Sequence, residues 1–416
     1  YSKGDNRMVN GDLMYIPGEY KLFDELIVNS LDQYIRLSEC QDCSIFTVKN
    51  IKITTNKETG EISVYNDGEG IKIEIHPTEK MYIPELIFGE LLTSSNYKED
   101  EIKHVGGKNG YGAKLVNIFS KEFTIETVDS NSNQKFAMTF YDNKTRKSKP
   151  KITKYKSKPY TKITYIPDYS RFKSEGLTDD MIKIMLKRSY DLAACTNNSV
   201  SIYFNDEKLE CKNFEKYMNF YIGDKTEKFR VHEIINDRWE IGVALSESMN
   251  FEQISFVNGI CTDIGGRHVN HVVDNLTKKI MANINASSKK KVVMQPAHIK
   301  QQFMVFIKAI IVNPVFDSQT KRKLTSLVSK FGSKCELNNE FIETVMKLGV
   351  LKRAESDAIH DAKQGFNKST DGKARSRKIH HPKLTDAKAA GTKFGIKCTI
   401  ALTEGDSAAN FIAKGI

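Results

Sequence analysis

The chain has 416 residues, of which 39% are hydrophobic, including 22 Phe and 17 Tyr. This length and composition suit two or three domains with cores of their own and argue against wholesale disorder. The formal net charge is +11, from 63 Lys and Arg against 52 Asp and Glu, which favours a polyanionic partner. No apolar run reaches membrane-spanning length, so no membrane partner is expected.

The seven cysteines form no even disulfide framework, which predicts a reducing, intracellular compartment. Cys40 and Cys43 form a lone C-x-x-C motif without a second pair or a nearby His. The motif therefore favours an incidental pair over a zinc or redox site. The chain opens at Tyr1 without Met or a signal peptide and stops at Ile416 inside the start of a predicted fold, so we expect a fragment of a longer protein.

The first informative stretch is a predicted helix over residues 23–33, with the sequence F-D-E-L-I-V-N-S-L-D-Q. Glu25, Asn29 and Asp32 stand at i, i+4 and i+7, so their side chains share one helical face. Glu25 could deprotonate a water molecule, and the carboxamide oxygen of Asn29 could hold a hard cation such as Mg2+. On this stretch alone, a solvated helix face is the alternative.

Two predicted strands follow, at residues 45–54 and 61–66. The second strand runs into an N-D-G-E-G motif at residues 66–70. Its two glycines would let a flat ring approach the backbone at Gly70, and Asn66 could both donate to and accept from an adenine edge. The same motif by itself is also a common hairpin turn.

A helix with a polar end is predicted over residues 84–97, and a glycine-rich motif, G-G-K-N-G-Y-G-A-K-L, occupies residues 106–115. Its order, G-x-x-G-x-G, differs from a Walker loop and from a dinucleotide fingerprint. The glycines would expose backbone N–H groups at the start of a helix over 113–119, whose positive end attracts phosphate, and Lys114 adds a charge. A flexible glycine lid is the alternative.

In this order the three motifs resemble those of the GHKL ATPases, which include gyrase, type II topoisomerases, the ninety-kilodalton heat-shock chaperone, MutL and histidine kinases. The sequence at residues 20–29, 91–97 and 106–115 resembles the eukaryotic-type DNA topoisomerase II in particular. The resemblance implies an α+β protein of cellular or large-DNA-virus origin. It would consist of a GHKL (Bergerat) ATPase α/β sandwich, followed by a ribosomal-protein-like transducer domain with a left-handed β-α-β crossover.

The rest of the chain fits a mixed sheet followed by a second unit. Predicted strands lie at residues 123–128, 135–141, 161–166, 200–204, 238–245 and 253–258, and predicted helices at 179–194 and 265–281. A short apolar strand is predicted before Glu404. The resemblance implies an ATPase domain at 1–222, a transducer domain at 223–347, a linker at 348–394 and the truncated start of a TOPRIM domain at 395–416.

The resemblance also implies ATP hydrolysis by in-line attack of water, with ATP and Mg2+ as cofactors. Glu25 would be the general base, Asn29 the magnesium ligand and Asn66 the adenine contact. Lys321, in the Q-T-K sequence at 319–321, would reach from the transducer to oppose charge developing on the γ-phosphate. The implied ATP-binding residues are Asn29, Asp32, Asn66, Gly70, Ser94, Ser95, Asn96, Gly107, Lys108, Asn109, Gly110, Tyr111, Gly112, Ala113, Lys114, Gln319 and Lys321.

The implied function is the ATP-operated N-gate of a type II DNA topoisomerase, an isomerase. ATP-driven dimerisation through the ATPase domain and domain rotation would be coupled to passage of one DNA duplex through a double-strand break in another. Double-stranded DNA and a second copy of the chain are the implied partners, in the nucleus of a cell or in a viral factory or virion. Lys289, Lys290 and Lys291 are candidate DNA-sensing residues, with a solvated charge run as the alternative.

Glu404, in an E-G-D-S sequence, would bind Mg2+ at a TOPRIM site. Neither a D-x-D partner motif nor a catalytic Tyr accompanies it, so the chain is expected to hydrolyse ATP without cleaving DNA. The sequence departs from the family pattern at Gln33, Lys72 and Lys108, where Asn, Pro and Arg are usual.

Two other functions stay open. A GHKL chaperone or mismatch-repair clamp would share the first three motifs but would not explain the Q-T-K and E-G-D-S sequences. A non-catalytic DNA-binding scaffold with a degenerate pocket is the second, and the intact Glu25 and Lys321 argue against it.

Overall fold

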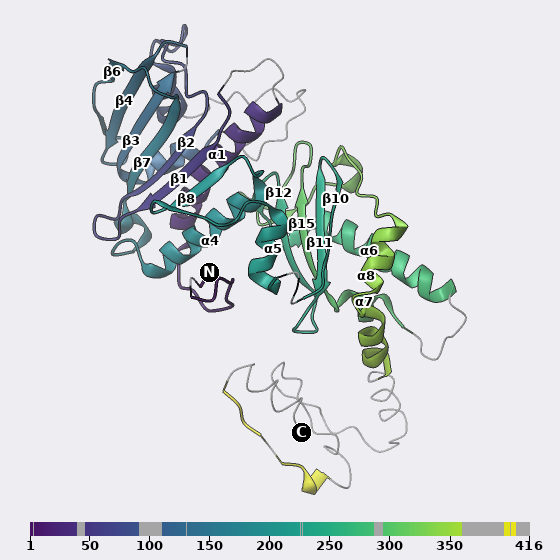
Figure 1. Cartoon of the computed structure of the whole chain (residues 1–416). Coiled ribbons are helices and arrows are strands. Elements are labelled where there is room, and N and C mark those ends of the chain that lie inside the picture. The colour runs from purple at the N-terminus through teal and green to yellow at the C-terminus, as the bar shows by residue number, and fades with distance from the viewer. Residues whose placement is uncertain are drawn as a thin grey trace. The chain divides into compact units, whose positions relative to one another are not determined.

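The computed structural model describes most of the chain and divides it into two compact units, Tyr1–Ala358 and Ile359–Ile416. The described residues are 1–2, 4–39, 46–90, 110–129, 131–224, 226, 228–286, 294–359, 395–399 and 401–404. The first unit contains two large sheets and almost all of the described helices (Figure 1).

The first sheet has nine strands in the order β5-β4-β3-β7-β2-β1-β8-β9, with β6 paired to β4. Its pairs are antiparallel except β1 and β8, which run parallel. In β4 and β7 burial alternates along the strand, because one face of the sheet is covered and the other is not. The strands are β1 (Asn50–Thr55), β2 (Ile62–Asp67), β3 (Ser120–Asp129), β4 (Gln134–Tyr141), β5 (Arg146–Lys147), β6 (Lys151–Lys154), β7 (Tyr160–Pro167), β8 (Ser201–Phe204) and β9 (Glu207–Lys208).

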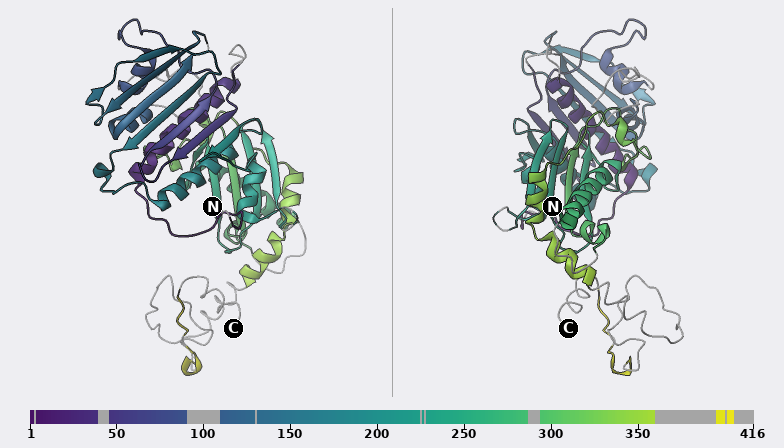
Figure 2. Two further views of the ribbon diagram at one scale, coloured as in Figure 1. Left: turned by 60° about the vertical axis from the view of Figure 1, so that its left-hand side comes forward. Right: turned by 90° about the vertical axis from the view of Figure 1, so that its right-hand side faces the viewer.

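Helices cover one face of this sheet, and α1 is central among them (Figures 1 and 2). Phe23, Ile27 and Leu31 of α1 are buried in the same hydrophobic core as strand residues such as Ile51 and Phe123. The helices are α1 (Pro17–Glu39), α2 (Ile83–Gly89), α3 (Gly112–Ile118), α4 (Asp179–Cys195) and α5 (Phe214–Ile222), with a 3-10 helix, η2, at Tyr169–Phe172. Helix α4 begins where the Thr178 side chain accepts a hydrogen bond from the Met181 N–H, a standard N-cap.

The second sheet has five strands in the order β10-β11-β15-β12-β13. Strands β12 and β15 are parallel neighbours, and α6 lies between them in sequence, so they form a β-α-β crossover. The strands are β10 (Val231–Asn236), β11 (Trp239–Leu245), β12 (Glu252–Val257), β13 (Ile260–Cys261) and β15 (Phe303–Ala309), and a separate pair joins β14 (Gly265–Gly266) to β16 (Lys323–Leu324). The helices are α6 (Arg267–Ala286), α7 (Pro296–Lys300), α8 (Asn339–Met346), the 3-10 helix η3 (Val328–Lys330) and a helix over 350–359.

The two sheets have separate hydrophobic cores, but the cores adjoin. The second core contains the inward residues of β11, β15 and α6. Phe256 of β12 and Phe306 of β15 belong instead to the first core, with α1 and the first sheet. The second sheet is therefore packed directly on the helices of the first.

The second unit has one described element, the 3-10 helix η4 (Gly395–Lys397). The strand predicted before Glu404 is wrong for the part of this stretch that the structure describes, where no residue is in a strand. Ile396 and Leu402 are 94% and 90% exposed. Among the described residues of this unit no strand lies beside the stretch, and a lone extended segment with exposed apolar side chains is not stable as a strand.

Candidate active site

Helix α1 presents Glu25 to a buried site. Glu25 is 6% exposed, and its Oε1 lies 2.9 Å from Nζ of Lys21, one helical turn earlier. The same oxygen lies 4.0 Å from Nζ of Lys321, which comes from the loop between β15 and β16. Glu25 therefore lies close to Lys321, although almost 300 positions separate them in the sequence. One comes from a helix on the first sheet and the other from a loop of the second.

Helix α3 closes the other side of the Glu25 carboxylate. A Cβ added to Gly112, the first residue of α3, would lie 2.0 Å from Glu25 Oε2, so any other residue there would displace the carboxylate. Lys114 is 2% exposed and donates a hydrogen bond from Nζ to the carbonyl of Gly110 at 2.7 Å. Burial lowers the pKa of Lys114 to about 8.

The end of β2 carries Asn66 beside α1. The Ser30 hydroxyl donates to Asn66 Oδ1 at 3.3 Å, and Asn66 Nδ2 donates to the carbonyl of Asp67 at 2.9 Å. Gly70 has a φ of +75°, and a Cβ there would lie 1.9 Å from the carbonyl oxygen of Val128 in β3. The protein's own backbone therefore already requires glycine at this position, in addition to any approach of a flat ring.

Asp67, between Asn66 and the glycines, shapes this turn. Its Oδ1 accepts from the backbone N–H groups of Lys49 and Asn50, at 2.6 and 2.8 Å, and its Oδ2 accepts from the Asn50 side chain at 2.7 Å. These contacts bind the N-D-G-E-G turn to the start of β1. The sequence analysis assigns no separate role to Asp67, although Asp at a strand end commonly accepts hydrogen bonds from nearby N–H groups.

The two predicted ATP contacts in the Q-T-K loop differ in their burial. Lys321 is 8% exposed and adopts a left-handed backbone with φ of +58°, which directs the chain back towards β16. Gln319 is exposed. Arg322 forms a two-oxygen ion pair with Asp263, with Nε 2.9 Å from each carboxylate oxygen, and this pair fixes the loop to the segment before β14.

A second set of charges, which sequence reasoning missed, adjoins Glu25. Lys21 Nζ also pairs with Asp24 Oδ2 at 2.8 Å, and Arg188 of α4 donates from Nε to Asp24 Oδ1 at 2.7 Å. Burial alone would raise the pKa of Asp24, but the charges and hydrogen bonds of Lys21 and Arg188 hold it well below its ordinary value. Lys21 could have been found from its i, i+4 spacing to Glu25, whereas Arg188 has no signal in the sequence.

The other predicted site residues divide into three groups. Asn29 is exposed and Asp32, Gly110, Tyr111 and Gly112 are partly exposed, whereas Ala113 is buried. Glu404 is exposed in the second unit. No group of three or more His, Cys, Asp or Glu side chains that could hold a metal occurs among the described residues. The predicted residues outside the described part of the chain are Cys40, Cys43, Ser94, Ser95, Asn96, Gly107, Lys108, Asn109, Lys289, Lys290 and Lys291.

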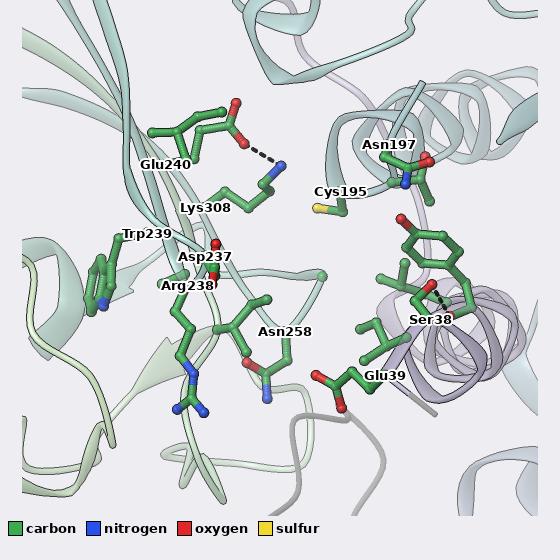
Figure 3. Close-up of a pocket in the computed structure, with 18 of the residues that line it drawn as sticks. Ser38, Glu39, Cys195, Asn197, Asp237, Arg238, Trp239, Glu240, Asn258 and Lys308 are labelled. Atoms are coloured by element: carbon green, nitrogen blue, oxygen red, sulfur yellow. Dashed lines mark hydrogen bonds and ion pairs between the residues drawn. The ribbon is translucent and has the colours of Figure 1, made fainter. Parts of the chain in front are cut away.

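A separate pocket of about 270 Å³ lies between the C-terminal end of α1 and the second sheet (Figure 3). Ser38 and Glu39 of α1 line one side, and Arg238 and Asn258 line the other. Glu240 pairs with Lys308 at its edge and also contacts His232 Nε2 at 2.9 Å. The pocket does not include Glu25 or Lys321, so it is distinct from the site described above.

Comparison with solved structures identifies the fold. The ATPase region of Saccharomyces cerevisiae topoisomerase II is 40% identical in sequence and superposes with a TM-score of 0.78, covering 86% of this chain and 90% of that one. The chain belongs to the topoisomerase II family. The ATPase and transducer domains of topoisomerase II from Balamuthia mandrillaris are 42% identical, with a TM-score of 0.80 over 87% of this chain and 90% of that one. The α+β GHKL fold predicted from the motifs is thereby confirmed.

Relatives that match almost the whole of this chain belong to the same family. The probable DNA topoisomerase 2 of Dictyostelium discoideum is 43% identical over 99% of this chain, and that of Acanthamoeba polyphaga mimivirus is also 43% identical over 99%. The chain spans only 27% and 32% of the lengths of these two relatives. A family model described as DNA gyrase B matches residues 212–377. None of these matches favours a chaperone, a mismatch-repair clamp or a scaffold.

In the part of the chain that the structure describes, no helix has both the length and the apolar character needed to cross a membrane.

Proposed function

We propose that this chain binds and hydrolyses ATP and works as the N-gate of a type II DNA topoisomerase. The observation that carries the proposal is the meeting of Glu25 and Lys321, 4.0 Å apart and both less than 10% exposed, from two differently folded parts of the chain. A base on one part and a cation on the other suit a reaction in which nucleotide is sensed by both parts at once.

In the proposed mechanism Glu25 orients a water and accepts its proton. The Glu25 carboxylate is held between Lys21 and the first residue of α3, so it loses little conformational freedom when the reaction begins. Lys321 would leave the carboxylate for the γ-phosphate and oppose the charge that develops there. Lys114 and the N–H groups at 110–113 would contact the other phosphates, together with Gly107, Lys108 and Asn109.

Residues that could bind the adenine ring and a metal ion lie near Glu25. Asn66, held by Ser30 at the end of β2, would contact adenine. Asn29 is exposed one helical turn after Glu25 and offers a neutral oxygen. Mg2+ in nucleotide sites takes one or two protein oxygens and completes its shell with phosphates and water, so a single Asn29 ligand fits it. When bound, the ion would neutralise phosphate charge.

The wider role involves DNA and a second copy of the chain. The net charge of +11 supports a polyanionic partner, and DNA is the substrate that the relatives' names give. Nucleotide-driven dimerisation through the ATPase domain would close a gate around one duplex, with Lys289, Lys290 and Lys291 sensing it. Glu404 would contribute a magnesium ligand to a TOPRIM-type DNA-cleavage centre.

The test is ATP hydrolysis by the chain, with and without duplex DNA, beside Glu25→Gln. Because a general base contributes about 10²–10⁴-fold, kcat should fall by at least about 100-fold. Glu19→Gln is the matched control, since Glu19 is equally buried on α1 but has no contact with Lys21 or Lys321 among those described, and its kcat should not change. A hydrolysis-resistant ATP analogue should shift the wild-type chain to a dimer in size-exclusion chromatography. Full activity in Glu25→Gln would refute the assignment of the base.

A further inference from the structure

Arg188 joins the helix of the catalytic carboxylate to the second sheet. Its side chain is 0% exposed and lies on α4. Nε donates to Asp24 Oδ1 of α1 at 2.7 Å, while Nη2 donates to the carbonyl of Gly259 at 3.1 Å. Gly259 forms the turn between β12 and β13. One guanidinium therefore holds a carboxylate of the first part of the chain and a backbone carbonyl of the second.

Lys21 links the Asp24 carboxylate to Glu25. Lys21 lies between the two acids, with Nζ 2.8 Å from Asp24 Oδ2 and 2.9 Å from Glu25 Oε1. The chain of contacts is thus Gly259, Arg188, Asp24, Lys21 and Glu25, and all four side chains in it are buried or nearly so. Ion pairs in such a dry environment are stronger and less screened than those at the surface.

An apolar contact follows the same route. Gly259 has a φ of +73°, and a Cβ on it would lie 1.7 Å from Cδ2 of Leu31, six residues after Glu25 on α1. The turn therefore touches α1 directly as well as through Arg188. A displacement of this turn would act on the helix that carries the base at two points.

We propose that Arg188 is a positioning residue for ATP hydrolysis, which holds Glu25 through Asp24 and Lys21 and makes its position depend on the β12–β13 turn. This inference rests on the proposed function. While Arg188 occupies Oδ1 of Asp24, Lys21 is shared between Asp24 and Glu25. When Arg188 is withdrawn, Asp24 loses one of its two cations and draws Lys21 towards itself, away from Glu25.

The chemistry of arginine explains why this residue type stands there. Its planar fork can donate in two directions at once, whereas a lysine ammonium is a single point on a flexible stem. Burying a guanidinium is costly, and Nη1 of Arg188 finds no hydrogen-bond partner among the described residues. A close-packed apolar side chain would satisfy packing alone at lower cost, so the buried charge has its use in specifying geometry.

The first experiment compares Arg188→Lys with Arg230→Lys in the full chain. Arg230 is a matched control, because it is 2% exposed and also donates to a glycine carbonyl, that of Gly223 at 2.8 Å, with no contact to α1 among those described. We expect kcat of Arg188→Lys to fall about tenfold, with KM for ATP and affinity for a hydrolysis-resistant analogue within twofold. Arg230→Lys should keep its kcat even where its thermal midpoint falls equally.

A double-mutant cycle separates positioning from a general loss of structure. If Arg188 acts through Glu25, Arg188→Lys should not lower further the residual hydrolysis of Glu25→Gln, whereas a structural defect would add to it. Asp24→Asn keeps the shape of the carboxylate and should reproduce the loss in kcat, so it serves if Arg188→Lys does not fold. The inference is overturned if Arg188→Lys hydrolyses ATP at the wild-type rate while Glu25→Gln does not. If Glu25→Gln is itself fully active, the proposed function fails first.

Discussion

Gly112→Ala tests whether the first turn of α3 fixes the Glu25 carboxylate. The added Cβ would lie 2.0 Å from Oε2, 2.8 Å from Cδ and 3.2 Å from Cβ of Glu25. Ordinary contact begins near 3.4 Å, so the carboxylate oxygen has to retreat by about 1.4 Å. It cannot do so freely, because Oε1 is held by Lys21 at 2.9 Å.

The expected effects on stability and on activity have different sizes. Alanine in place of a helical glycine gains at most about 1 kcal/mol, and overpacking costs about 1–3 kcal/mol, so the net loss of stability is no more than about 3 kcal/mol. Misplacing a catalytic group by an ångström costs about 100-fold in rate. We therefore expect a folded variant whose kcat is about 100-fold lower.

The assay is steady-state ATP hydrolysis, together with calorimetric binding of a hydrolysis-resistant analogue and a thermal midpoint. Gly11→Ala is the control, because its Cβ would meet nothing within 4 Å. Analogue affinity should change little if the glycine serves the carboxylate. A variant with wild-type kcat and weakened analogue binding would refute the reasoning and assign Gly112 to phosphate approach instead.

Two further predictions follow from buried titratable groups. Burial lowers the pKa of Lys114 to about 8, from an ordinary value of 10.5. Between these two pH values the folded chain binds fewer protons at this site than the unfolded chain. The stability of the wild type relative to Lys114→Met should therefore rise from pH 8 to 10.5 in thermal melts. Equal pH slopes in the two proteins would contradict this. Burial likewise lowers the pKa of His268 to about 3 from 6.5, so wild-type stability should fall relative to His268→Gln between pH 6.5 and 3 in urea titrations. An unchanged difference between the midpoints at pH 7 and pH 4 would count against a neutral buried imidazole.

The sequence predicted those elements whose residues repeat with a clear period. The helix expected at 179–194 is α4 at Asp179–Cys195, and the strands expected at 61–66 and 238–245 are β2 and β11 to within one residue at each end. Strand β15 (Phe303–Ala309) was not predicted, although it lies beside both β11 and β12 in the second sheet. It is buried on both faces and so lacks an alternation of polar and apolar residues.

The site could be predicted only where a motif is local in sequence. Glu25, Asn66 and Lys114 stand in three short motifs, and the resemblance supplied Lys321. Arg188 was not predicted because its significance lies in a contact with Asp24 across 164 residues, which no spacing within the chain reveals. The motifs include Gly70 and Gly112, but the sequence explains only part of why glycine stands there. In the structure, the space that a side chain would need is occupied by Val128 at Gly70 and by Glu25 at Gly112.

The junction of the two sheets shows why a boundary in composition is not a boundary in packing. The predicted division at 222 and 223 falls where α5 ends, yet Phe256 and Phe306 of the second sheet are buried in the core built around α1. Separating the sheets would expose both rings at a cost of about 2–3 kcal/mol each, and would also strip Asp24 of Arg188 or Arg188 of Gly259. A small rotation about α1 would keep the rings buried while changing the contacts at Gly259. Any movement of the second sheet that follows nucleotide turnover should therefore be a rotation against α1. Such a rotation would change the hydrogen bond between Arg188 and the carbonyl of Gly259.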